Sequence, residues 1–245
     1  TDGAQNRALF VPMQLLYLSP VLVPVWLAGF VALWRDRRFR SLAVAYPVLC
    51  VLTLALGGKP YYTMPLLVLL VAAGAEPAWR WVLRHRVWAS AAAVAGALVS
   101  VLIALPVLPV GALGPVLAVN PEQGEQVGWR ELTASVAQAW AQAGPGAVIF
   151  THNYGQAGAV ERYGPEYGLP QPYSGHMSYA DWGPPPDSAS GRVVVVGPRH
   201  AAFTGCLVVV MHEAVIENEE DGTEVAVCDP VDWSRVWPEL RRFYG

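Results

Sequence analysis

The sequence predicts a membrane-embedded helical part followed by a small α/β domain. Its 245 residues are 54% hydrophobic and 14% charged, whereas about a quarter of the residues of an ordinary soluble domain are charged. Four long apolar runs precede residue 115, and beyond it helix and strand patterns alternate between Gly/Pro turns. Charge divides at the same place. Residues 1–115 hold nine of the 16 Lys and Arg but three of the 19 acids, so the remainder is acidic.

The four apolar runs are the predicted transmembrane helices. A spanning helix needs about 20 apolar residues, and it tolerates prolines. The predicted spans cover residues 8–34, 41–57, 60–79 and 87–110. The middle two are short, so a re-entrant hairpin is an alternative for this pair. Buried helices of a large soluble protein are the alternative for all four.

Two arginine clusters set the expected orientation of these helices. One cluster follows the first run at residues 35–40, and the other precedes the fourth run at residues 80–86. Short loops rich in Lys and Arg stay in the cytoplasm, so we expect both loops on that side. The turn around Lys59 and the domain from residue 120 onward are then expected outside the cytoplasm.

The predicted extracytoplasmic α/β domain covers residues 120–245. Its first helix, residues 128–143, is amphipathic, because Trp129, Leu132, Val136 and Trp140 recur at helical spacing. Short apolar runs predict strands at residues 147–151, 192–197, 207–215 and 224–228, and further helices are predicted at residues 156–163 and 234–243. Residues 164–191 form a long aperiodic loop of a kind that is often functional. The acidic turn at residues 217–222 is interpreted as a solvated hairpin tip.

Three cysteines are too few for a disulfide scaffold, and none forms a CxxC zinc motif. Cys206 lies next to the third predicted strand, and Cys228 ends the fourth. Cysteines on neighbouring strands in an oxidising compartment can pair when their Cα atoms come within about 7 Å. Because the sequence does not give the strand order, the paired and unpaired states both stay open.

The turn Gly57-Gly-Lys-Pro-Tyr-Tyr62 holds the only lysine among 16 basic residues. The compact ammonium of Lys59 suits a phosphate headgroup. The alternative is that Lys59 extends to the membrane surface while Tyr61 and Tyr62 belong to an aromatic belt.

Several long segments carry a family resemblance. GGKPYYTMPLLVLLVAAGA at residues 57–75 is followed in order by GWRELTASVAQAW, AVIFTHNYGQAGAVERYGPEYGLPQPYSGHMSYADWGP, ENEEDGTEVAVCDP and WPELRRFYG. Together they resemble the C-terminal half of bacterial family 39-like membrane glycosyltransferases, relatives of protein O-mannosyltransferases and of the aminoarabinose transferase. The resemblance implies a polytopic C-type enzyme that takes a sugar from a polyprenyl-phosphate donor at the extracytoplasmic face. It also implies that Lys59, Tyr61 and Tyr62 lie near the donor phosphate.

The resemblance further implies that the catalytic carboxylates belong to a first extracytoplasmic loop outside these residues. Of the acids before residue 120, Asp36 and Glu76 are predicted at the cytoplasmic side and Asp2 at the N-terminus. We therefore expect no catalytic residue in this chain, which is interpreted as a fragment working with further N-terminal helices of the same enzyme and with membrane lipid. No cofactor is expected. A non-enzymatic, membrane-anchored binding or assembly module is the rival interpretation.

In the α/β domain, residues 151–155 end a strand and lead into a helix, where binding residues collect in open α/β sheets. Asn153 and Tyr154 are therefore candidate substrate-binding residues, and His176 of the long loop is a further candidate. The alternative for His152 and Asn153 is that they cap the helix.

Other chemistries are disfavoured by the sequence. Ser174 lacks the GxSxG pattern of a nucleophilic serine, and the histidines lack paired metal-binding spacing. The aromatic residues in and directly before the long loop either stack on sugar or pack the loop; they are Tyr163, Tyr167, Tyr173, Tyr179 and Trp182. No basic patch suggests a nucleic-acid partner.

Overall fold

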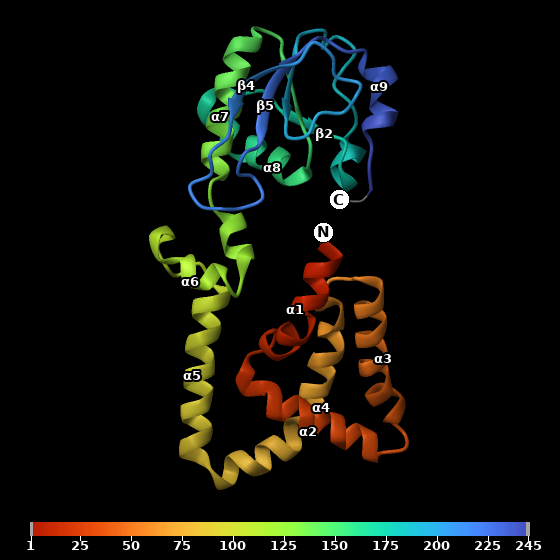
Figure 1. Cartoon of the computed structure of the whole chain (residues 1–245), viewed down its shortest axis with the longest axis vertical. Coiled ribbons are helices and arrows are strands. Elements are labelled where there is room, and N and C mark those ends of the chain that lie inside the picture. Colours follow the sequence, from red (N-terminus) through yellow and green to blue (C-terminus); the bar gives the residue numbers. More distant parts are fainter. Residues whose placement is uncertain (1, 244–245) are drawn as a thin grey trace. The chain divides into compact units, whose positions relative to one another are not determined.

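The computed structural model describes the backbone of residues 2–243, and the side chains of residues 7–243 except Leu9. The chain divides into two compact units (Figure 1). Thr1–Val107 is called the helical unit, and Leu108–Gly245 is called the α/β unit.

The helical unit contains five α-helices and two 3-10 turns in its described part. They are α1 (Asp2–Leu16), η1 (Pro20–Leu22), α2 (Val23–Arg35), α3 (Arg40–Leu56), η2 (Pro60–Thr63), α4 (Met64–Arg84) and α5 (Arg86–Ala104). Two helical stretches, Pro60–Arg84 and Arg86–Ala104, are long and apolar enough to cross a membrane. The chain is therefore membrane-associated, but four straight spans are not present in the described part.

The first predicted span, residues 8–34, is wrong as a single helix. The helix breaks after Leu16, and the stretches Phe10–Leu16 and Pro20–Arg35 are bent by 84°. Ser19 has a φ of 84°, and the Pro20 ring that follows cannot supply a helical N–H. The bent pair is therefore a broken span or a re-entrant loop.

The other predicted spans differ in length. α3 matches the second, but its 17 residues are short for a crossing. α4 ends at Arg84 instead of residue 79. Arg80 and Arg84 end the apolar run but are still part of the helix. α5 stops at Ala104 instead of residue 110, since Leu105 precedes a proline and is extended.

Helices α2 and α4 are in close contact at two glycines, Gly29 of α2 and Gly74 of α4. A Cβ atom added at Gly29 would lie 1.8 Å from the Leu70 carbonyl oxygen, and one at Gly74 would lie 2.0 Å from the Val25 carbonyl oxygen. Small residues allow membrane helices to approach backbone to backbone. α5 exposes apolar side chains such as Val87, Val94 and Leu98, which suits contact with lipid.

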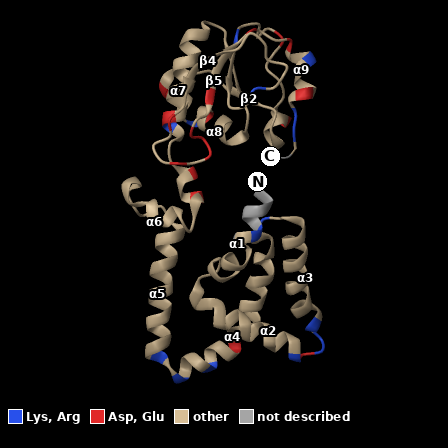
Figure 2. Cartoon of the chain, in the orientation of Figure 1, with Lys and Arg blue, Asp and Glu red and all other residues tan. Residues whose placement is uncertain are grey.

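The arginine clusters lie at one end of the helical unit. Figure 2 shows Lys and Arg gathered in the α2–α3 and α4–α5 loops, whereas the α3–α4 turn lies at the opposite end of this unit. This arrangement agrees with the two clusters sharing one side of a membrane.

The α/β unit is built on a five-stranded mixed sheet in the order β2-β1-β3-β5-β4. β1 is parallel to β2 and β3, while β5 is antiparallel to β3 and β4. The strands are β1 (Val148–Thr151), β2 (Pro172–Ser174), β3 (Val193–Val196), β4 (Leu207–Met211) and β5 (Glu224–Cys228). The main helices are α7 (Trp129–Ala143), α8 (Tyr154–Tyr163) and α9 (Trp233–Leu240), and shorter ones are η3 (Val110–Ala112), α6 (Gly114–Leu117), η4 (Pro121–Gln126), η5 (Gly164–Tyr167) and η6 (Met177–Trp182).

Helices cover both faces of this sheet (Figure 1). On one face Ile149, Val194 and Val225 pack against α7 and α8, with Leu132 and Val136 of α7 fully buried as predicted. On the other face Phe150 and Val195 pack against Phe203 and α9. The sheet is thus the middle layer of an α/β domain, as expected.

Four details of the prediction were wrong. The loop at residues 164–191 contains β2 and two 3-10 turns, and β2 exists because it pairs with β1. β4 ends at Met211 rather than residue 215, α8 begins two residues earlier at Tyr154, and α9 stops at Leu240.

Cys206 and Cys228 form a disulfide, with a Cα–Cα distance of 3.9 Å. Cys206 directly precedes β4 and Cys228 ends β5, so pairing of the two antiparallel strands brings the cysteines together. The paired alternative is confirmed. Cys50, in α3, is free.

Candidate functional site

The turn between α3 and α4 positions Lys59. Gly57 ends α3 in the left-handed conformation at φ 68°, and the Gly58 N–H donates to the Thr53 carbonyl at 2.9 Å. Arg7 donates through Nε and Nη2 to the carbonyls of Leu54 and Ala55, each at 3.1 Å. Arg7 thereby binds two of the last carbonyls of α3, which lack a partner within the helix, and this fixes the turn.

A buried amide holds the other side of this turn. Gln14 is 8% exposed, and its Nε2 donates to the Pro60 carbonyl at 3.1 Å. Its Oε1 accepts from Thr63 Oγ1 at 2.6 Å and from the Tyr46 hydroxyl at 3.2 Å. The start of η2 is therefore anchored to α1 and α3.

Lys59, Tyr61 and Tyr62 are exposed on this anchored turn, and the two tyrosine rings contact each other edge to face with centroids 5.1 Å apart. Among the described side chains, no carboxylate lies within 4.0 Å of the Lys59 ammonium. The side chain of Asp2 lies outside the described residues. The turn therefore presents one ammonium without a carboxylate partner among the described side chains, and two phenols.

A second group of polar residues lies at the carboxyl ends of the parallel strands. β1, β2 and β3 all end at one edge of the sheet, followed by His152, Gly175 and Gly197. The chain leaves β1 into α8 on one face, and leaves β3 toward Phe203 on the other face. Such a divergence of connections is where open α/β sheets bind ligands.

Asn153 caps α8, which confirms the structural alternative for this residue. Its side-chain oxygen accepts from the Gln156 N–H at 2.8 Å, and Gln156 Oε1 accepts from the Asn153 N–H at 3.3 Å. The side-chain nitrogens of both residues donate to Glu220, at 3.3 Å from Asn153 and 2.7 Å from Gln156.

Glu220 corrects the interpretation of the acidic turn as a solvated tip. It is 7% exposed, and Thr223 Oγ1 donates to it at 3.1 Å in addition to the two amides. A buried carboxylate is tolerated when several donors surround it. The sequence missed this role because Asn153 and Glu220 are 67 residues apart.

Tyr154 and His176, the other two candidates, lie together. The Tyr154 N–H donates to His176 Nδ1 at 3.4 Å, and the two rings stack with centroids 5.1 Å apart. His176 is 7% exposed, and its Nε2 is buried without a hydrogen-bond partner in the described part of the chain. Burial, and then the neighbouring Arg242 guanidinium, lower the pKa of His176.

Arg242 is a site residue that the sequence analysis did not identify. Its backbone pairs with the turn after β2: its N–H donates to the Gly175 carbonyl, and the Met177 N–H donates to its carbonyl, both at 2.8 Å. Its guanidinium donates to the His152 carbonyl. Burial and this guanidinium lower the pKa of His152 as well. No period or motif in the final segment pointed to this contact.

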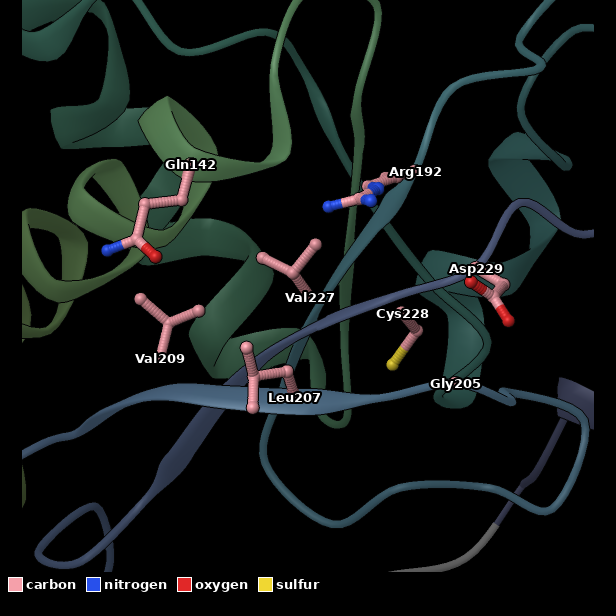
Figure 3. A pocket seen from close by; sticks show the side chains of 8 residues that line it. All are labelled: Gln142, Arg192, Gly205, Leu207, Val209, Val227, Cys228 and Asp229. Carbon is pink, nitrogen blue, oxygen red and sulfur yellow. The ribbon is translucent and has the colours of Figure 1, made fainter.

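A separate pocket lies beside the disulfide (Figure 3). Gln142 of α7, Arg192 before β3 and residues of β4 and β5 line it, among them Leu207 and Val227. Asp229 fits here because Gly205 has no side chain; a Cβ there would lie 2.1 Å from the Asp229 carboxylate. Lys59 lines neither this pocket nor the small one around Phe30 and Trp34.

The remaining chemistries weighed from the sequence find no support in the described residues. Ser174 is fully buried. Among the side chains that the structure describes, no three metal-ligating groups gather closely enough to hold an ion. In the long loop, Tyr179 contacts Trp182, and its hydroxyl donates to Glu161 at 3.3 Å, so Tyr179 helps to pack the loop.

Comparison of the chain with protein families, with curated proteins and with solved structures finds no match.

Proposed function

We propose that this chain is part of a polytopic membrane glycosyltransferase that transfers a sugar from a polyprenyl-phosphate donor at the extracytoplasmic face. In this proposal the Lys59 ammonium binds the donor phosphate, and Tyr61 and Tyr62 flank it. The α/β unit shapes access of the acceptor. The acid or base that the transfer needs comes from other residues of the enzyme.

The observation that carries the proposal is the state of Lys59. It is an exposed cation without a carboxylate neighbour among the described side chains, on a turn anchored by Arg7 and Gln14. The arginine clusters occupy the opposite end of the helical unit (Figure 2). A cation at a membrane surface attracts anionic headgroups, and a fixed turn reduces the entropy lost on binding.

Binding of a polyprenyl phosphate to the chain in nanodiscs tests this role, measured by native mass spectrometry. Lys59→Ala should weaken binding about tenfold or more, the effect of losing one charged hydrogen bond. Arg84→Ala is the matched control, because it removes an exposed cation from the other end of the helical unit. Equal losses in both variants would exclude a specific phosphate contact at Lys59.

The disulfide supports the extracytoplasmic location of the α/β unit, because disulfides persist in oxidising compartments. Asp187 is exposed in this unit. In a Cys50→Ala background, Asp187→Cys should react with an impermeant maleimide in intact cells. Labelling only after lysis would overturn the topology.

A membrane-anchored binding module without enzymatic activity is the second candidate. The α/β unit favours it, because this unit has a core on both faces of its own sheet. Binding of a soluble partner by the chain, unaffected by Lys59→Ala and without affinity for polyprenyl phosphate, would favour this candidate.

A further inference from the structure

Four residues at the carboxyl edge of the sheet form a group that the proposed donor site does not use. They are called the edge cluster and comprise His152, Tyr154, His176 and Arg242. They come from the turn after β1, the turn after β2 and the segment after α9. Gly175 permits this assembly, because a Cβ there would lie 2.1 Å from the Leu240 carbonyl oxygen.

Arg242 is a partly buried cation without an acid partner. Among the described side chains no carboxylate lies within 4.0 Å of it, whereas its neighbour Arg241 pairs with Asp181 at 2.7 Å. Its guanidinium has five N–H donors, and one contact, to the His152 carbonyl, is observed. The nearby Glu220 carboxylate is held by Asn153, Gln156 and Thr223. No carboxylate among the described side chains pairs with Arg242, so its guanidinium can bind an anion.

His176 supplies a directional donor beside it. Because Nδ1 accepts the Tyr154 N–H, the ring proton is assigned to Nε2. That Nε2 is buried and has no hydrogen-bond partner among the described residues, so it is free to donate to an acceptor. The Tyr154 ring stacks on the face of this imidazole and is itself 55% exposed.

The position of the edge cluster adds to the positive electrostatic field of Arg242. Tyr154 is the first residue of α8, a helix of 10 residues whose N-terminal end carries the positive pole of its dipole. The cluster also lies where the connections of β1 and β3 diverge. Guanidinium, imidazole N–H and helix N-terminus therefore meet at one edge of the sheet.

We propose that the edge cluster is a binding site for an oxyanion, a phosphate or carboxylate group of a ligand. The anion accepts charge-assisted hydrogen bonds from Arg242 and a hydrogen bond from His176 Nε2. The ligand is a soluble anionic molecule or an anionic lipid headgroup.

Inorganic phosphate is the probe, titrated into the whole chain in phosphatidylcholine nanodiscs while the imidazole NMR signals of His176 are followed. We expect a saturable shift of these signals. Arg242→Gln should weaken binding about tenfold or more. Arg241→Gln is the matched control and should leave the affinity within about twofold, since its charge is already paired.

The membrane composition distinguishes the two sources of the anion. If phosphatidylglycerol nanodiscs shift the His176 signals and block phosphate, the site takes a lipid headgroup. If phosphate binds equally in both nanodiscs, the site takes a soluble anion. The proposal is overturned if neither phosphate nor phosphatidylglycerol changes the His176 signals, or if Arg241→Gln and Arg242→Gln lose affinity equally. Neither result depends on Lys59, so the proposed donor site stands or falls separately.

Discussion

Removal of the disulfide should destabilise the α/β unit while leaving the helical unit intact. Cys206 and Cys228 are 22 residues apart in the sequence. The chain-entropy relation for a loop of this length gives about 3 kcal/mol of stabilisation at 25 °C. For a unit of this size, this corresponds to roughly 10 °C in the unfolding midpoint.

Thermal unfolding of the whole chain, followed by tryptophan fluorescence with and without dithiothreitol, measures this effect. Thiol titration of the unfolded protein should rise from one free cysteine to three on reduction. The double variant Cys206→Ala, Cys228→Ala should reproduce the reduced state and lose its sensitivity to dithiothreitol. Cys228 is also buried, so the variant should be somewhat less stable than the reduced protein.

Cys50→Ala is the matched control, because Cys50 is unpaired and belongs to the helical unit. It should leave the response to dithiothreitol unchanged. An unaltered midpoint, when titration shows that three thiols are free, would refute the stabilising role of the disulfide. Protein alkylated in intact cells before extraction should likewise contain one reactive thiol; three would argue against an oxidising location.

Two further predictions concern packing and pH. Gly29→Ala places a Cβ 1.8 Å from the Leu70 carbonyl, so α2 and α4 must separate by roughly 1.5 Å, at a cost of about 1–3 kcal/mol in the stability of the helical unit. Gly111→Ala, with open space around it, should be neutral in the same unfolding assay. Burial lowers the pKa of three histidines of the α/β unit, His152, His176 and His212. Below their ordinary pKa of 6.5 the unfolded chain binds protons that the folded chain does not, so stability should be complete above about pH 6.5 and fall as the pH decreases. His176→Gln should flatten the pH dependence of the unfolding midpoint, and an unchanged slope would contradict this assignment.

The sequence predicted the parts of the fold that local patterns determine. The valine run at residues 193–196 and the apolar face of α7 have strong local signals, and both appear where expected. β2 was missed because it has three residues, begins with Pro172 and becomes a strand through pairing with β1. Ser19-Pro20 is a local signal for the break after Leu16. The prediction relied on the length of the apolar run and therefore missed the break.

The candidate sites divide in the same way. Lys59 became a candidate because it is the only lysine of the sequence and lies in a glycine turn. Asn153 became a candidate because it precedes a helix. The roles of Glu220 and Arg242 could not be predicted, because their contacts with the β1–α8 turn span 67 and 90 residues. Long-range pairing, which depends on the strand order, creates both contacts.

The proposed sugar transfer from a polyprenyl-phosphate donor, measured at limiting donor in membranes, tests the proposed function most directly. Lys59→Ala should reduce transfer at least tenfold without loss of folding. Lys59→Arg should restore part of it, since a guanidinium keeps the charge but not the geometry. Arg84→Ala should transfer at the unmodified rate. Unchanged transfer by Lys59→Ala, or an equal loss in Arg84→Ala, would contradict the assignment of Lys59 to the donor phosphate.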